Sequence, residues 1–388
     1  MSDFVDGNRI ILLTRGTEYF PQLEAACDAA RHEIHLETYI FDADETGQRI
    51  GAALKRAAAR GVATHVLLDG FGSKRLPRGF IGELQDAGVR ILVYRPERTP
   101  VFMARRRLRR MHRKMAVFDA RVAFIGGINI IDDMHTPGHT PPRFDYAVRI
   151  EGPLLARIYP AAKRLWALVQ FMQLGDHWHD SRKLQPAGDR AGAQAAAFVV
   201  RDNLRHRSDI EEAYLDAIAA ARSEILIANA YFFPGLSFRR ALVDAAARGV
   251  RVTLLLQGRV EYVLLHYASR ALYGAFLDAG IRITEYHKSF LHAKVAVIDG
   301  IWATVGSSNI DPFSLLLARE ANVVVKDRAF ATALRESLVA AMREGAREVK
   351  RESWHRQPLA VRVTTWIAYG IARLLTGLFA YGRAREFN

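Results

Sequence analysis

The chain has 388 residues, half of them hydrophobic, which is long enough for two domains with substantial cores. Its net charge of +14 and isoelectric point near 10.0 predict attraction to a polyanion, either nucleic acid or an anionic membrane surface. A single cysteine, Cys27, excludes an intramolecular disulfide, and the first residues have neither the basic stretch nor the apolar run expected of a signal peptide or membrane span.

The first half alternates short apolar runs with helical patterns, which predicts alternating strands and helices. Strands are expected at residues 9–14, 34–41, 62–68 and 89–94, and helices at residues 17–31, 46–60 and 80–87. Gly61 and Gly88 follow two of these helices, and a glycine commonly ends a helix. This order is typical of an α/β fold in which helices cover a sheet.

The second half repeats the same order of elements. Helices are expected at residues 212–221, 238–248 and 264–279, and strands at residues 224–232, 250–256 and 281–286. The segment RGVATHVLLDG corresponds to RGVRVTLLLQG, and DAGVRILVY corresponds to DAGIRITEY. We therefore predict a duplicated α/β unit.

A polar stretch rich in Gly, Pro, Arg and Asp, residues 175–193, separates the two halves. We place the boundary near Ser181, which gives a first domain at 1–181, a second at 182–352 and a tail at 353–388. Four side chains of this stretch could imitate a metal cluster: Asp176, His177, His179 and Asp180. Such short mixed runs are usually solvated linker, so no metal site is predicted.

One polar motif occurs twice. Each copy consists of a histidine, a lysine two positions later, an aspartate five positions further on, and then a glycine and an asparagine. The first copy is His112, Lys114, Asp119, Gly126 and Asn129, and the second, 180 positions later, is His292, Lys294, Asp299, Gly306 and Asn309. Residues two apart in a strand share a face, so each histidine and lysine should point into one cleft. The aspartates lie at the end of the motif strand and are expected to hold its turn rather than to touch phosphate.

This pattern, H-x-K-x4-D followed by a glycine-rich turn and an asparagine, resembles the phospholipase D superfamily, in which two such motifs meet in one active site. Within that superfamily the chain looks most like bacterial cardiolipin synthases, in particular their short B-type form. The residues that carry this likeness are 60–73, 144–153, 221–235 and 306–325. The resemblance implies two homologous α/β sandwich domains related by a pseudo-two-fold axis, with the active site between them.

Two histidines in one cleft can divide the work of phosphoryl transfer, because one can attack phosphorus while the other protonates the leaving oxygen. A covalent phosphohistidine would then form. Positive charge and hydrogen bonds for the phosphate oxygens are expected from Lys114, Lys294, Asn129, Asn309, Ser307 and Ser308. With these residues the reaction needs neither a metal nor another cofactor.

The resemblance implies further roles. It makes Asp145 and Glu320 the acids that orient the histidine rings and favour their charged forms. It also makes His112 the nucleophile and His292 the general acid and then the general base, although the sequence itself does not decide which histidine attacks.

The expected activity is that of a cardiolipin synthase, which joins two phosphatidylglycerol molecules into cardiolipin and releases glycerol. A hydrolase of the phospholipase D type, or another phosphatidyltransferase, differs only in whether water or another alcohol resolves the intermediate. A nuclease would share the motifs and the basic charge, but it has no use for an apolar amphipathic tail. Anionic phospholipids, phosphatidylglycerol and cardiolipin among them, are therefore the expected partners, with no nucleic acid. The acceptor lipid and the oligomeric state stay open.

Two further segments point to lipid. Residues 102–114 mix arginines with large apolar residues beside the first motif, which suits anionic headgroups and acyl chains. Residues 258–280 carry more apolar side chains than one core-facing stripe requires, and they are expected either to line a lipid groove or to pack as ordinary core.

The tail, residues 358–385, is long enough to cross a bilayer, but Arg362 and Arg373 interrupt it. These arginines are three helical turns apart, so they are expected to form a polar stripe with Thr365 and Thr376, opposite apolar residues such as Trp366. A helix of this kind lies in the membrane interface. The alternatives are that it spans the membrane, or that it docks onto the protein's own surface or a second subunit as an ordinary amphipathic helix. We therefore expect a peripheral or monotopic protein on the cytoplasmic side of the cell inner membrane.

Overall fold

The computed structural model describes residues 3–96, 110–136, 140–174, 184–202, 206–260, 263–311 and 318–381. The predicted linker boundary near Ser181 and most of the basic segment at 102–114 lie outside these residues. The elements of the first half are β1 (Val5–Thr14), α1 (Arg15–Ala29), β2 (Glu33–Thr38), α2 (Glu45–Ala59), β3 (Ala63–Asp69), α3 (Arg78–Asp86), β4 (Arg90–Tyr94), β5 (Met115–Phe118), β6 (Val122–Gly126), β7 (Arg143–Phe144), β8 (Tyr146–Glu151) and α5 (Leu155–Leu174).

The second half repeats this series and adds helices at its end. Its elements are β9 (Gln194–Arg201), α6 (Asp209–Ala220), β10 (Glu224–Asn229), α7 (Leu236–Ala247), β11 (Arg251–Gln257), α8 (Val263–Arg270), α9 (Tyr273–Asp278), β12 (Arg282–Tyr286), β13 (Phe290–Leu291), β14 (Lys294–Ile298), β15 (Trp302–Gly306), β16 (Glu320–Lys326), α11 (Arg328–Gly345), β17 (Ala346–Glu348), α12 (Arg351–His355) and α13 (Leu359–Tyr381).

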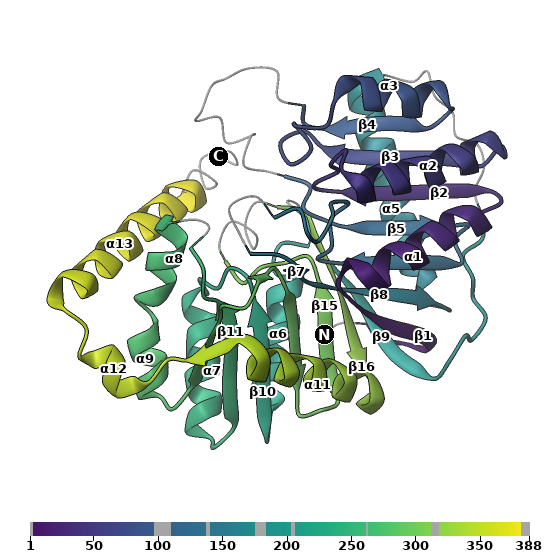
Figure 1. The fold of residues 1–388 in the computed structure, drawn as a ribbon. Helices are drawn as coiled ribbons and strands as arrows, with labels where there is room; N and C mark the ends of the chain where they lie inside the picture. Colours follow the sequence, from purple (N-terminus) through teal and green to yellow (C-terminus); the bar gives the residue numbers. More distant parts are fainter. Residues whose placement is uncertain are drawn as a thin grey trace.

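Among the described residues, 15 strands form one continuous sheet, and β7 and β13 pair in a separate two-stranded sheet. Apart from β17, the strand order of the large sheet is the same from its centre to either edge. From the seam outward, the first half runs β1-β8-β6-β5-β2-β3-β4 and the second runs β9-β16-β15-β14-β10-β11-β12, followed by β17 at the edge. β1 and β9 pair antiparallel where the halves meet. The mirrored order confirms the predicted pair of related α/β halves, which Figure 1 shows side by side.

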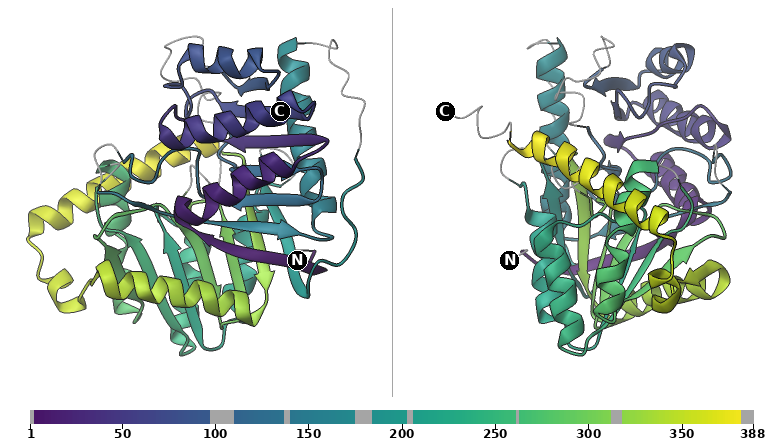
Figure 2. Two further views of the ribbon diagram at one scale, coloured as in Figure 1. Left: turned by 45° about the vertical axis from the view of Figure 1, so that its right-hand side comes forward. Right: turned by 90° about the vertical axis from the view of Figure 1, so that its left-hand side faces the viewer.

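Helices cover both faces of the sheet. In the first half, α1, α2 and α3 bury apolar side chains such as Leu23, Leu54 and Phe80 on one face, and α5 covers the other (Figure 1). In the second half, α6 to α9 cover one face and α11 the other (Figure 2). The core under α5 and α11 contains residues of both halves, and β6 and β8 pack there against β15 and β16.

Two expectations need correction. The single helix predicted at 264–279 is two helices, α8 and α9, which are separated by two residues. The tail does form the expected long helix, α13, but it packs along α8 through small residues, with Thr365, Ala368 and Ala372 buried. Thr365 therefore faces the protein instead of joining an outward polar stripe with Arg362 and Arg373, both of which are exposed.

Among the described residues, no helix combines the length and apolar character that crossing a membrane requires.

Candidate active site

Each motif histidine lies in a short segment that crosses to the opposite half. The backbone N–H of His112 donates to the carbonyl of Arg319 at 2.9 Å, and the N–H of His292 donates to the carbonyl of Phe144 at 2.8 Å. The second contact continues the parallel pair formed by β7 and β13. In both cases the next residue along the partner segment is an acid, which places Glu320 beside His112 and Asp145 beside His292.

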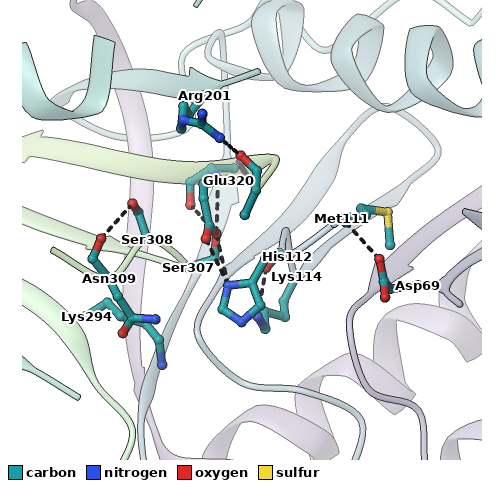
Figure 3. Close-up of polar contacts among 12 residues, drawn as sticks. Asp69, Met111, His112, Lys114, Arg201, Lys294, Ser307, Ser308, Asn309 and Glu320 are labelled. Carbon is teal, nitrogen blue, oxygen red and sulfur yellow. Dashed lines mark hydrogen bonds and ion pairs between the residues drawn. The ribbon is translucent and has the colours of Figure 1, made fainter. Parts of the chain in front are cut away.

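Each acid contacts Nδ1 of its own histidine ring. Nδ1 of His112 lies 2.9 Å from Oε1 of Glu320 (Figure 3). Nδ1 of His292 lies 2.6 Å from Oδ2 of Asp145. Glu320 and Asp145 are buried, whereas the side chains of His112 and His292 keep 15% and 11% of their surface exposed. With Nδ1 engaged by a carboxylate, Nε2 is the ring nitrogen placed for chemistry.

Burial opposes the charged forms of both histidine rings. Burial lowers the pKa of His112, and this outweighs the opposite effect of Glu320. Burial lowers the pKa of His292 further, with help from Lys294, Arg143 and Lys114. His112 itself also acts on the pKa of His292, so the two histidines share one electrostatic environment.

The motif lysines lie buried directly beneath the histidines. Nζ of Lys114 donates to the carbonyl of His112 at 2.7 Å, and burial lowers its pKa to about 7, with Lys294 adding to the shift. Nζ of Lys294 lies 2.8 Å from Nδ1 of His292 and 3.4 Å from Oδ2 of Asp145. Two ammonium groups therefore serve one cleft, each beside its own histidine.

The motif aspartates hold turns, as their positions predict. Both are in the left-handed region, with φ of 50° for Asp119 and 52° for Asp299, a conformation that aspartate tolerates better than most residues. The Asp119 carboxylate accepts from the N–H groups of residues 31, 32 and 33 at 2.8 Å. Asp299 accepts in the same way from residues 222, 223 and 224. Neither carboxylate points to the histidines.

The two asparagines and two serines predicted to bind phosphate fall into two groups. Asn129 and Asn309 are buried at the ends of β6 and β15, and Oδ1 of Asn129 accepts from the N–H of Ile40 at 3.0 Å. The hydroxyl of Ser307, in contrast, donates to Oε2 of Glu320 at 2.5 Å (Figure 3). Ser308 donates to the carbonyl of Asn309 at 3.3 Å. Ser307 is thus placed to hold the acid rather than a phosphate oxygen.

Gly127 occupies the position in the first half that Ser307 occupies in the second. A Cβ atom on Gly127 would lie 2.3 Å from Oδ1 of Asp145, so the carboxylate fills the space that the serine side chain takes in the other half. The two halves therefore hold their acids in different ways.

Sequence reasoning missed two contacts around His112. The ring of Tyr39 meets the imidazole edge to face, with centroids 4.8 Å apart. Arg113 makes a buried pair of hydrogen bonds to Glu37, each 2.7 Å long, which fixes the residue next to His112. The alternation of strand β2 places Glu37 and Tyr39 on one face, but no local pattern shows that this face meets the motif.

Within the described part of the chain, no three His, Cys, Asp or Glu side chains are grouped so that they could hold a metal ion. Asp176, His177, His179 and Asp180 lie outside the described residues.

Comparison with known proteins places this site in a family. The model of the family described as cardiolipin synthase, PLD-like domain, matches residues 23–141 and 214–341. The chain is 43% identical to cardiolipin synthase B of Escherichia coli K12 over 344 residues, which cover 86% of this chain and 80% of that protein. It is 31% identical to a cardiolipin synthase of a Geobacillus species, over 95% of this chain and 72% of that one. The solved phosphatidylserine synthase of Haemophilus influenzae has the same fold, with a TM-score of 0.70, 14% identity, and coverage of 95% of this chain and 94% of that one.

Proposed function

We propose that this chain, which belongs to the family of cardiolipin synthases with phospholipase D-like domains and is a phosphatidyltransferase, moves a phosphatidyl group from one phosphatidylglycerol to a hydroxyl of another. The observation that carries the proposal is the crossed pairing of acids and histidines, Glu320 with His112 and Asp145 with His292. This pairing makes one site with two oriented imidazoles.

In the first step, Nε2 of His112 attacks the phosphorus of phosphatidylglycerol. The bond from phosphorus to the glycerol oxygen breaks, and that oxygen takes a proton from His292. The products are free glycerol and a phosphatidyl group bound to His112. Because burial and the lysines keep the pKa of His292 low in the empty site, its proton depends on the bound phosphate, whose negative charge opposes the effect of the lysines.

In the second step, His292 accepts the proton from a hydroxyl of a second phosphatidylglycerol. The oxygen of that hydroxyl attacks phosphorus, the bond to His112 breaks, and cardiolipin leaves. Lys114, Lys294, Asn129 and Asn309 bind the non-bridging oxygens and stabilise the charge of both transition states. Ser307 acts indirectly, because it holds the acid that orients His112.

The membrane partner is an anionic phospholipid surface. Large apolar side chains of α13 point away from the protein: Val363, Trp366, Ile367, Ile371 and Leu374 are all exposed, as is Leu264 on the adjacent α8. Exposed Arg362 and Arg373 lie on the same helix and complement anionic headgroups. We therefore infer peripheral attachment through this α13 face, on the cytoplasmic side of the inner membrane.

The function is tested by lipid mass spectrometry on purified protein incubated with phosphatidylglycerol vesicles, with and without added glycerol. We expect cardiolipin and free glycerol, and added glycerol should suppress net cardiolipin formation by reversing the first step. His112→Ala should abolish turnover, whereas His32→Ala, at an exposed histidine on the turn that Asp119 holds, should not. Phosphatidic acid as the sole product, or cleavage of DNA with lipids untouched, would refute the proposal.

A further inference from the structure

The two halves of the active site are not equally filled. The strand registers give the equivalence: Glu37 pairs with Met115 and Leu67 in the first half, as Ala228 pairs with Val295 and Leu255 in the second. Two residues beyond, Tyr39 is therefore equivalent to Ala230, and Asp69 is equivalent to Gln257. At the first position an aromatic ring is replaced by a methyl group. At the second, a carboxylate that accepts hydrogen bonds is replaced by an amide that makes none among the described residues.

In the first half, both side chains at these positions make close contacts within the protein. The ring of Tyr39 lies against His112, with centroids 4.8 Å apart. The carboxylate of Asp69 accepts from the N–H groups of Phe71, Gly72 and Met111, at 2.9, 3.1 and 2.8 Å. This side of the cleft is closed by its own residues.

In the second half the same positions, Ala230 and Gln257, line a cavity. Ala230 has no side chain that could replace the ring, and its N–H donates at 2.9 Å to the carbonyl of Ala293, the residue after His292. The cavity is small, with a volume of about 30 Å³, and it opens to the surface. Its lining residues are Ala230, Tyr231, Phe232, Leu256, Gln257, Arg259, Leu265, His266, Ser269 and Tyr273.

Gln257 places a side-chain amide without a hydrogen-bond partner among the described residues in the wall of this cavity. Its side chain is 7% exposed, and neither its Oε1 nor its Nε2 has a hydrogen-bond partner among the described residues. Buried amides in folded proteins are nearly always paired, so an amide in a cavity wall without a partner among the described residues is placed to bind a hydroxyl group that enters the cavity. Arg259, by contrast, is already engaged, because it donates to the carbonyl of His287 and to the hydroxyl of Thr140.

We infer that this cavity binds the outer hydroxymethyl group of the glycerol moiety of the alcohol, first as leaving group and then as acceptor, and that Gln257 hydrogen-bonds its hydroxyl. A primary amide offers both a donor and an acceptor, which matches a hydroxyl group. His266 adds a second neutral polar group, since burial lowers its pKa to about 4, and Tyr231 and Leu265 offer surface to the carbon chain. The inference rests on the proposed function, and it places the alcohol next to His292, the residue assigned to move its proton.

The test separates attack on the donor from transfer to the alcohol. Full-length protein is given vesicles of phosphatidyl-p-nitrophenol, whose leaving group does not need the glycerol cavity, in the presence of glycerol. The intermediate then partitions between phosphatidylglycerol and phosphatidic acid. For Gln257→Leu we expect the ratio of these products to fall about tenfold, as for loss of one hydrogen bond, while the burst of p-nitrophenol is unchanged. Gln85→Leu, the same change at an exposed position of α3, should leave the ratio as in the unmodified protein.

Thermal unfolding supplies a second readout. Because the amide has no partner in the protein, Gln257→Leu should unfold at the same temperature or higher, and a clear decrease would assign Gln257 a structural role and overturn the inference. An unchanged product ratio in Gln257→Leu would also overturn it, while leaving the proposed function intact. If the unmodified protein makes only phosphatidic acid in glycerol, the proposed function fails and the inference fails with it.

Discussion

His112 and His292 are each oriented by a carboxylate from the opposite half. A small change beside a carboxylate in one half should therefore alter the orientation of the histidine in the other half. Gly127 shows this most directly, because a Cβ atom there would lie 2.3 Å from Oδ1 and 2.4 Å from Oδ2 of Asp145. Asp145 would have to move, and its 2.6 Å contact with His292 would be lost.

We therefore expect Gly127→Ala to lower kcat by about 10- to 100-fold, the usual effect of disturbing a residue that orients a reacting group. Overpacking should also cost about 1–3 kcal/mol of stability. The control is Gly82→Ala on α3, where an added Cβ meets nothing within 4 Å. Assays of turnover and thermal unfolding check both variants. Full activity in Gly127→Ala would mean that Asp145 does not orient His292.

The pKa of Lys114 predicts a pH dependence. Burial lowers this pKa to about 7, so the empty site loses the ammonium charge as pH rises above 7. If Lys114 binds a phosphate oxygen, kcat/KM for phosphatidylglycerol should fall above pH 7, by up to about tenfold per pH unit. The effect on kcat should be smaller, because bound phosphate raises the pKa of the lysine.

Lys114→Arg tests this assignment, because a guanidinium stays charged throughout the range. The variant should be slower, and its kcat/KM should fall less steeply between pH 7 and 9, because only the loss of the His292 proton then remains. A decrease as steep as in the unmodified protein would mean that Lys114 is not a titrating group.

At the scale of elements, α13 has an unusual distribution of side chains. It packs on the protein through Thr365, Ala368 and Ala372, and it leaves Trp366 and Ile367 each 58% exposed. A helix that buries small residues and exposes large apolar ones is suited to insertion into a membrane interface.

Trp366→Glu combined with Ile367→Glu should therefore weaken binding to phosphatidylglycerol-containing vesicles by at least about tenfold, through lost apolar burial and added repulsion. Vesicle sedimentation measures this. The control pair Leu168→Glu and Ile301→Glu makes the same charge change at exposed apolar positions on α5 and in the turn between β14 and β15. Unaltered vesicle binding by the α13 variant would mean that another segment, for example residues 102–114, contacts the membrane. Removing the helix is a poorer test, because Ala368 and Ala372 belong to the core.

The sequence predicted most elements because their apolar periodicity is local. It also predicted the motif residues, because a repeat with a constant offset is visible without a structure. It could not predict which acid meets which histidine, since Glu320 is 208 positions from His112 and Asp145 is 147 positions from His292. The role of Ser307 and the unpaired amide of Gln257 were hidden for the same reason. Both depend on packing between elements, which no periodicity records.

At the scale of the whole molecule, the two halves share structure as well as an active site. β1 and β9 join them into one sheet, and one core contains Val148 and Ile125 from the first half with Val305 and Val323 from the second. Separating the halves would expose this core and two strand edges, so neither half buries its apolar surface alone.

We therefore expect the halves to remain one cooperative unit after the chain is cut between them. A protease site inserted between Gly188 and Asp189, both exposed, allows cleavage of the folded protein. The cleaved protein should elute at the size of the intact 43.5 kDa chain, keep its turnover, and unfold in a single thermal transition that matches by two probes. Refolding it from denaturant should be slower and dependent on concentration, because the two pieces must then meet. Halves that separate under native conditions, or two distinct transitions, would show that the shared core contributes little. Something other than the shared core would then have to hold Glu320 against His112 and Asp145 against His292.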